Sequence, residues 1–95
     1  MSIPAIEEFE IRVGAVKDYG FDYTTYGWLA SGETISSSTW AIWPAITLSG
    51  AQNSAGITSV FVSGQQVGIT YKLINTITTS VGRTEVMVLE LTGRP

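Results

Sequence analysis

Apolar and polar residues alternate with a period of two along most of this chain, and that pattern predicts β-strands. In the stretch "EFEIRV", residues 8–13, charged and apolar side chains exchange at every position. Successive side chains of a strand point to opposite faces, so such a stretch presents one polar, solvent-exposed face and one apolar face. No apolar stripe at the helical spacing i, i+3, i+4, i+7 persists beyond about one turn. We therefore expect an all-β protein.

Turn-forming residues divide this pattern into short segments. The turn signals are "SGE" at 31–33, Pro44, "GAQNSAG" at 50–56, "SGQQVG" at 63–68 and "SVGR" at 80–83. In the last of these, Gly82 is placed to adopt a positive φ and close a hairpin. The strands expected between them lie near 8–16, 34–43, 46–50, 57–63, 69–79 and 83–92. The stretch 18–32 fits no clean strand, and we interpret it as a folded loop with a short helical turn at 23–29.

Six or seven short strands at this spacing are typical of an immunoglobulin-like sandwich of two antiparallel sheets, with a small β-barrel as the alternative. Tyr71 follows a turn at the start of the penultimate strand, which predicts a tyrosine corner. We expect Trp40 and Ile42 to fill the centre of the core from a strand of the other sheet. Trp28 and Leu29 are expected to close one end of it.

Composition limits the domain organisation and the possible partners. The 95 residues hold no repeat or linker, so we expect a single domain over residues 1–95. Only 14% of the residues are charged, against about 25% in an average soluble domain. The net charge is −3, and the five basic residues are scattered, which argues against nucleic-acid binding. No apolar run approaches the roughly 20 residues of a membrane span, and the acidic start "MSIPAIEEFE" is unlike a signal peptide.

The side chains available for chemistry are few. Histidine and cysteine are both absent, which excludes disulfides, thiolate chemistry and His-dependent catalysis. Glu7, Glu8 and Glu10 lie close together, but they fit the wet side of a strand better than a carboxylate pair for hydrolysis. Asp18 and Asp22 flank a glycine with too few further oxygen donors for a calcium loop. We therefore expect no enzymatic activity, no cofactor and no metal site.

The late stretch "GRTEVMVLEL", residues 82–91, is apolar on both faces of a predicted strand. Met87, Leu89 and Leu91 share one face, whereas Val86 and Val88 lie on the other. A small domain has no obvious use for apolar side chains on both sides of a strand. The second face is therefore a candidate protein interface.

Two further residues extend this candidate interface. Ile74 lies on the neighbouring predicted strand, and Phe61 belongs to the same kind of surface because Val60 and Val62 point inward on its strand. Burying an exposed valine contributes roughly 1.5–3 kcal/mol, so such a face can supply several kcal/mol to a contact. The alternative is that the N-terminal segment or the 18–32 loop covers this face within the domain.

Five aromatic residues gather in the ten-residue stretch "YGFDYTTYGW". They are Tyr19, Phe21, Tyr23, Tyr26 and Trp28. In a small domain, such rings pack into the core or under a loop. An exposed, coplanar set would instead form a platform for sugars.

Three stretches of the sequence resemble the fiber-tail adaptors, which are small virion proteins of tailed bacteriophages. They are "DYGFDYTTYGWLASGETISSSTWAI", "TSVFVSG" and "GITYKLINTITTSVGRTEVMVLEL". The family shows D-Y-x-x-D-W-x-x-W-L, a Gly-acid-Thr-Ile step and S-T-W, followed by T-Y-x-V-x-N-x-I-T-T-x-x-G-R-T-D. The matching residues here are Asp18, Tyr19, Asp22, Trp28, Leu29, Gly32, Glu33, Thr34, Ile35, Ser38, Thr39, Trp40, Thr70, Tyr71, Asn75, Ile77, Thr78, Thr79, Gly82, Arg83 and Thr84.

The resemblance implies a structural virion protein that is not an enzyme and that joins the tail or neck of the particle to its receptor-binding fibers. Its implied partners are neck, tail or portal-side proteins and tail fibers, with several copies around the particle axis. It implies a location in the virion after synthesis in the bacterial host cytoplasm. A carbohydrate-binding module or a capsid decoration protein stays open as the alternative.

Overall fold

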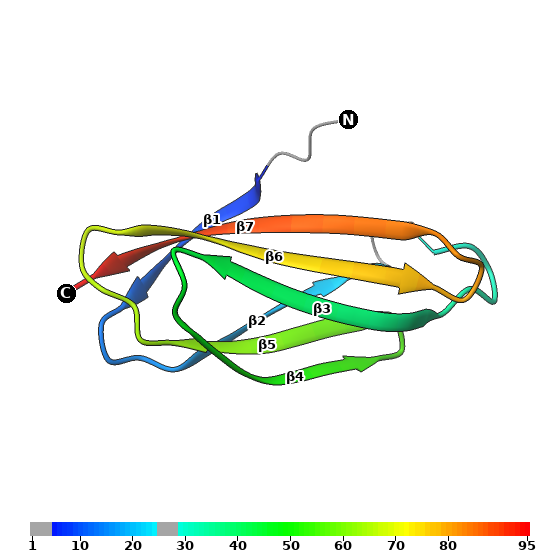
Figure 1. The fold of residues 1–95 in the computed structure, drawn as a ribbon, viewed down its shortest axis with the longest axis horizontal. Helices are drawn as coiled ribbons and strands as arrows, with labels where there is room; N and C mark the ends of the chain where they lie inside the picture. Colours follow the sequence, from blue (N-terminus) through cyan, green and yellow to red (C-terminus); the bar gives the residue numbers. More distant parts are fainter. Residues whose placement is uncertain (1–4, 25–28) are drawn as a thin grey trace.

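The computed structural model describes residues 5–24 and 29–95, with side chains from Glu8 onward, and these residues form seven β-strands (Figure 1). The strands are β1 (Ala5–Arg12), β2 (Lys17–Asp22), β3 (Ile35–Trp43), β4 (Thr47–Ser54), β5 (Ile57–Ser63), β6 (Thr70–Thr79) and β7 (Thr84–Arg94). Within the described ranges, no helix is long and apolar enough to cross a membrane.

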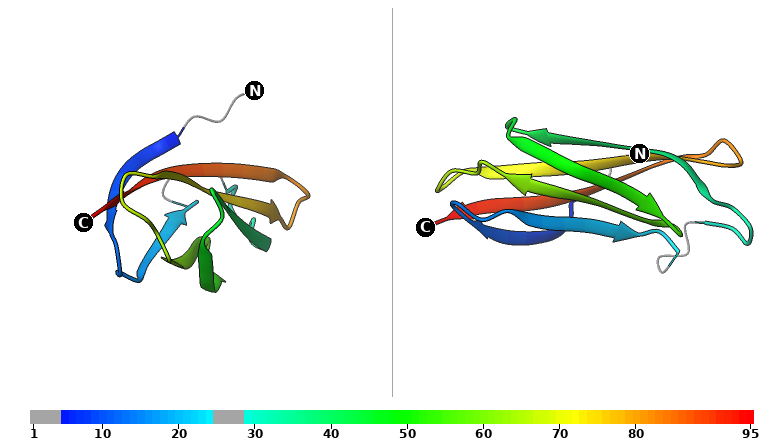
Figure 2. Two further views of the ribbon diagram at one scale, coloured as in Figure 1. Left: turned by 60° about the vertical axis from the view of Figure 1, so that its left-hand side comes forward. Right: turned by 90° about the horizontal axis from the view of Figure 1, so that it is seen from below.

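The strands form two sheets that face each other. One sheet has the order β1-β7-β6-β3 and the other the order β2-β5-β4 (Figures 1 and 2). Strands β3, β6 and β7 thus share one sheet and β2, β4 and β5 the other, as in immunoglobulin domains, while β1 pairs in parallel with β7. The predicted immunoglobulin-like sandwich is confirmed, and the barrel alternative is wrong.

Strand β2 corrects the prediction of a loop over 18–32. The first strand ends at Arg12 rather than near residue 16, and β2 pairs with β5 from Lys17 to Asp22. The alternating pattern did not predict this strand, because Gly20 interrupts it and glycine is unfavourable inside strands. The packing requires it, since a Cβ atom at Gly20 would collide with the carbonyl oxygen of Thr58.

Strand β4 is longer than predicted. A bulge between Ser49 and Gln52, with Gly50 at φ 61°, lets the strand continue to Ser54 where a turn was expected. The turn follows at residues 55–56. The helical turn predicted at 23–29 lies largely outside the described residues.

The core lies between the sheets and is built by the inward side chains of six strands. Met87, Leu89 and Leu91 of β7 are buried, as their alternation predicted. The other buried apolar residues are Ile11, Phe21, Tyr23, Ile42, Val60, Val62, Tyr71, Leu73 and Ile77. The loop residue Leu29 packs against this core as expected, whereas Trp28 lies outside the described residues.

The prediction that Trp40 and Ile42 belong to the sheet opposite to that of Tyr71 is wrong. Strand β3 pairs with β6, so Trp40 lies opposite Asn75 and Ile42 opposite Leu73 within one sheet. Both side chains still point into the core. Ile42 is 6% exposed, and the half-buried ring of Trp40 stacks on Phe21 with centroids 5.8 Å apart.

The side chain of Asn75 lies fully buried at the centre of β6 and makes four hydrogen bonds. Its Oδ1 atom accepts from the hydroxyls of Tyr23, at 2.8 Å, and Thr58, at 2.7 Å. Its Nδ2 atom donates to Ser38 Oγ at 2.9 Å and to the carbonyl oxygen of Thr39 at 3.0 Å. The amide therefore has every partner that it can take and links β6 to both sheets.

Tyr71 forms the predicted tyrosine corner. Its ring is buried at the start of β6, and its hydroxyl accepts a hydrogen bond from the backbone N–H of Gln66 at 2.9 Å. This bond ties the loop between β5 and β6 to the strand that follows it. The corner fixes one end of β6.

An ion pair fixes the other end of β6 and the beginning of β7. The Glu33 side chain is 1% exposed, and its carboxylate accepts hydrogen bonds from the Arg83 guanidinium, at 2.6 and 3.2 Å, and from the Ala30 backbone N–H at 2.7 Å. Hydrogen bonds from Arg83, Thr79 and Ala30 lower the pKa of Glu33 from its ordinary 4.5 to about 2. In the loop between β6 and β7, which contains Arg83, Gly82 has the predicted positive φ, at 86°. The pair thus holds the 29–34 segment against the β6–β7 hairpin.

The tyrosine corner predicts that Tyr71→Phe destabilises the domain. Removing the hydroxyl leaves the Gln66 N–H without its acceptor, and we expect a loss of about 1–2 kcal/mol in the free energy of unfolding. Urea titration followed by tryptophan fluorescence measures it. Tyr19→Phe is the matched control, because the Tyr19 hydroxyl is buried without a hydrogen-bond partner among the described residues. An equal loss in both variants would contradict the role of the corner.

The ion pair predicts a dependence of stability on pH. Because folding lowers the pKa of Glu33 from 4.5 to about 2, its contribution is complete above pH 4.5 and is lost as the pH falls toward 2. We expect Glu33→Gln to lower the urea midpoint at pH 6 and to reduce the fall between pH 4.5 and 2. Glu8→Gln, at an exposed carboxylate, is the control. If Glu33→Gln kept the full acid dependence, other groups would be responsible for it.

Candidate protein-binding surface

The predicted interface residues of β6 and β7 meet on the outer face of the four-stranded sheet. Strand pairing places Ala41, Ile74 and Val88 side by side across β3, β6 and β7. Val86 lies two residues from Val88 on the same face, opposite Thr76. The sequence therefore identified three residues, Ile74, Val86 and Val88, that the fold brings together.

These three side chains are half-buried, and the domain core does not include them. The other sheet lies against the inner face of β6 and β7, not against this one (Figures 1 and 2). In the alternative interpretation the N-terminal segment or the 18–32 loop covers this face. Of these, β2 belongs to the other sheet, whereas residues 1–4 and 25–28 lie outside the described residues.

Strand β3 adds two residues to this surface that sequence reasoning missed. Trp43 is 66% exposed, and Ala41 is exposed beside Ile74. The signal was present, because the inward positions of Trp40 and Ile42 make Ala41 and Trp43 face outward on the same strand. We call the set Ala41, Trp43, Ile74, Val86 and Val88 the outer apolar face.

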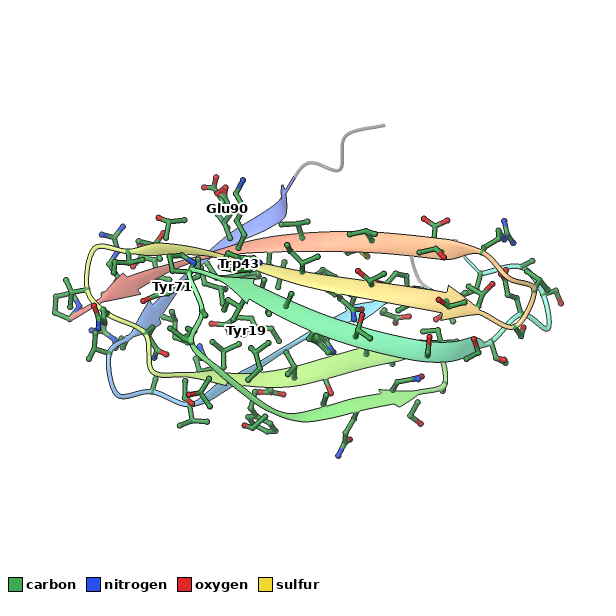
Figure 3. All side chains as sticks on the ribbon, viewed as in Figure 1. Tyr19, Trp43, Tyr71 and Glu90 are labelled. Carbon is green, nitrogen blue, oxygen red and sulfur yellow. The ribbon has the colours of Figure 1, made fainter. Side chains whose placement is uncertain are left out.

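Charged residues border the outer apolar face on one side. Trp43 lies next to Lys72, Lys72 next to Glu90, and Glu90 next to Glu8, in one row across the sheet. Figure 3 shows Glu90 on the outside of the sheet, while Tyr19 and Tyr71 lie between the two sheets. An apolar centre with a polar rim is the usual composition of a protein interface.

Phe61 lies on a different surface. It belongs to β5 in the three-stranded sheet, and Val60 and Val62 point into the core as predicted. Its ring is 42% exposed and lies beside Gly50, where a Cβ atom would come within 3.0 Å of the ring. Phe61 therefore faces away from the outer apolar face, across the thickness of the sandwich.

The described aromatic residues of the 19–28 stretch point inward. Phe21 is 3% exposed and Tyr23 is completely buried, while Tyr19 is half-buried with its ring centroid 5.7 Å from that of Phe9. These three rings form no exposed sugar platform, and for them the packed interpretation is correct. Tyr26 and Trp28 lie outside the described residues.

The described carboxylates do not assemble into a site for chemistry. Glu8 and Glu10 are exposed on β1, which is the wet side that the alternation predicted. Asp22 accepts hydrogen bonds from the hydroxyl and the backbone N–H of Thr24, at 2.6 and 3.1 Å. Among the residues described, no group of three or more acidic side chains could hold a metal ion.

A hollow of about 560 Å³ opens where β7 ends. It is lined by Glu10, Arg12, Ala15, Lys17, Arg94 and Pro95. Glu10 lies 3.4 Å from Arg94 in an exposed ion pair. Among the described residues of this lining, Glu10 is the one acidic side chain.

Comparison with protein families gives one match over most of the sequence. The family model described as "Podophage GP4 fiber-tail adaptor protein gp77" matches residues 12–92. The matched range contains every residue of the outer apolar face and Phe61. No curated protein matches this sequence.

Proposed function

This chain belongs to the podophage fiber-tail adaptor family, and on that premise we propose that the outer apolar face binds a neighbouring virion protein. The family is structural and non-enzymatic, and its members join the tail to the fibers. The contacts that the name implies are therefore with tail and fiber proteins. The observation that supports the proposal is the apolar set on β3, β6 and β7, which faces away from the other sheet.

The energetics suit a protein contact. Val86 and Val88 are already half-buried, so complete burial adds about 1 kcal/mol for each of them. Trp43 has two thirds of its surface exposed and can contribute more, because tryptophan is enriched among the residues that dominate binding energy. Together these side chains supply several kcal/mol to an interface.

We propose Phe61 as part of a second contact. An adaptor binds one protein on its tail side and another on its fiber side, which requires two separate surfaces. Phe61 and Ile57 are exposed on β5, 42% and 48% respectively, in the sheet opposite to the outer apolar face. This position supports a role as the second docking surface.

The family places the protein in the tail of the virion. We propose that several copies surround the neck or tail axis, with portal-side or neck proteins on one surface and fibers on the other. In this proposal the chain is synthesised in the bacterial host cytoplasm and enters the particle during assembly. Mass analysis of purified particles, with the copy number measured against the portal protein, tests this arrangement.

The interface proposal predicts a separation between folding and assembly. Replacing Val86 and Val88 together by Thr keeps their shape but adds two hydroxyls that a dry contact cannot hydrogen-bond. We expect the urea midpoint to change little and incorporation into particles to fall about tenfold, which corresponds to roughly 1.4 kcal/mol. Incorporation is measured by quantitative mass spectrometry of particles assembled with the variant as the only copy.

The matched control is the double variant Val67→Thr, Val81→Thr, at two loop valines that are 55% and 64% exposed. It makes the same chemical change away from the outer apolar face and should assemble normally. Normal incorporation of the Val86, Val88 variant would contradict the proposal. Unfolding of that variant would show that the face belongs to the core.

A further inference from the structure

We propose that the free edge of β3 takes up an extended strand of a partner virion protein, which adds a fifth strand to the four-stranded sheet. This inference rests on the proposed function of the outer apolar face, since Ala41 and Trp43 of β3 belong to that face. To that proposed function the inference adds a mode of binding. The partner pairs its backbone with β3 and continues over the apolar side chains of β6 and β7.

Of the four sheet edges in the described part of the chain, β3 is the least protected. Native edge strands resist pairing with other chains through charged side chains, prolines or bulges. Strand β1 carries three glutamates and an arginine, and β2 carries Lys17, Asp18 and Asp22. Strand β4 is uncharged but is interrupted by the bulge at Gly50. Each of these three edges therefore has a feature that opposes strand addition.

Strand β3 has nine residues, "ISSSTWAIW", and none of them is charged. Its register is irregular only near its start, between Ile35 and Ser37, so residues 37–43 form one regular run. Pro44 comes after this run and not within it. Residues 37–43 are thus a regular, uncharged stretch of edge strand.

Among the described strands, the backbone of β3 is paired on one side only. Its hydrogen-bonded neighbour is β6, while β4 of the other sheet lies near it, and Ser38 lines one hollow together with residues 51–53. In an antiparallel ladder, every second residue directs its N–H and C=O away from the neighbour. Between residues 37 and 43 these groups form a row that an added strand can pair with, as in other complexes that extend a sheet.

The side chains beside this edge define the chemistry of the added strand. Thr39, Ala41 and Trp43 point outward from β3 and are exposed. A neighbouring strand places its own outward side chains next to them, where apolar or β-branched residues pack well and a charge finds no partner. We therefore expect an extended, uncharged segment with an apolar residue beside Trp43.

A second copy of this chain fits the edge less well. The other edges of the described chain are charged or bulged, so a copy would have to offer its own β3. Two copies joined in this way would lie side by side in one longer sheet. The apolar residues Ile74, Val86 and Val88 would remain uncovered on both copies. A different protein that supplies a strand and also covers the face leaves no such surface.

Hydrogen exchange followed by mass spectrometry tests the inference on the unaltered protein. The isolated chain and the chain inside intact virions are compared over the peptide that contains residues 37–43. We expect the edge amides of β3 to exchange at least about tenfold more slowly in the virion, because they gain hydrogen bonds there. A contact through the face alone leaves these amides unpaired. Unchanged exchange over 37–43 would overturn the inference.

A pair of edge variants gives a second readout. Thr39→Lys puts a charge beside the open edge, whereas Ser31→Lys makes a similar change at an exposed loop residue outside both proposed surfaces. We expect incorporation into virions to fall about tenfold for Thr39→Lys and less than about twofold for Ser31→Lys, at unchanged thermal unfolding.

The outcomes separate this inference from the proposed function. If Thr39→Lys assembles normally while the Val86, Val88 variant does not, the face binds a partner without an added strand, and the inference is wrong. If both assemble normally, the proposed function fails as well. If sedimentation shows that the isolated chain is a dimer and that Thr39→Lys makes it a monomer, the occupant is a second copy and the assignment to a partner is overturned.

Discussion

The four hydrogen bonds of Asn75 are the contact on which the arrangement of this sandwich depends. A buried amide is costly unless all its donors and acceptors are paired, and here Tyr23, Thr58, Ser38 and Thr39 pair every one. These partners come from β3, from β5 and from the residue after β2, so both sheets are connected to the middle of β6. A shift of β6 by one residue would break all four bonds. The register of β6 is therefore strongly specified.

That register determines which side chains face outward. With Asn75 inside, the odd-numbered residues of β6 point into the core and the even-numbered ones, including Ile74, point away from it. Strand β7 follows the same register through its pairing with β6, which places Val86 and Val88 beside Ile74. The tyrosine corner and the ion pair of Glu33 with Arg83 hold the two ends of this hairpin. The outer apolar face is thus presented on a fixed support.

A structural adaptor needs such a support more than it needs reactive groups. The chain has no histidine or cysteine, and its described carboxylates lie on the surface or in ion pairs and hydrogen bonds. Few of its residues are charged. The uncharged edge strand β3 borders the outer apolar face, and the aromatic residue Phe61 is exposed on the opposite sheet. These features are of value to a protein that is held between others. They would be a liability for an isolated domain, because they favour association.

The amino-acid sequence by itself determined what each strand does locally. Alternation identified the inward residues of β5 and β7, the turn residues located the hairpin at Gly82, and the position of Tyr71 identified its corner. The apolar residues on both faces of β7 were enough to indicate a candidate surface. A period of two reports the face of a side chain, but it does not report which strand lies beside it.

Only the tertiary structure decided the neighbours. It placed β3 next to β6, so that Ala41 and Trp43 joined the outer apolar face, and it placed Phe61 on the far side of the sandwich. It also showed β2, which Gly20 had concealed, because the need for glycine there comes from a carbonyl group of β5 nearly forty residues later in the chain. Strand pairing is a contact between distant segments, and the local pattern of any one segment contains no record of its partner.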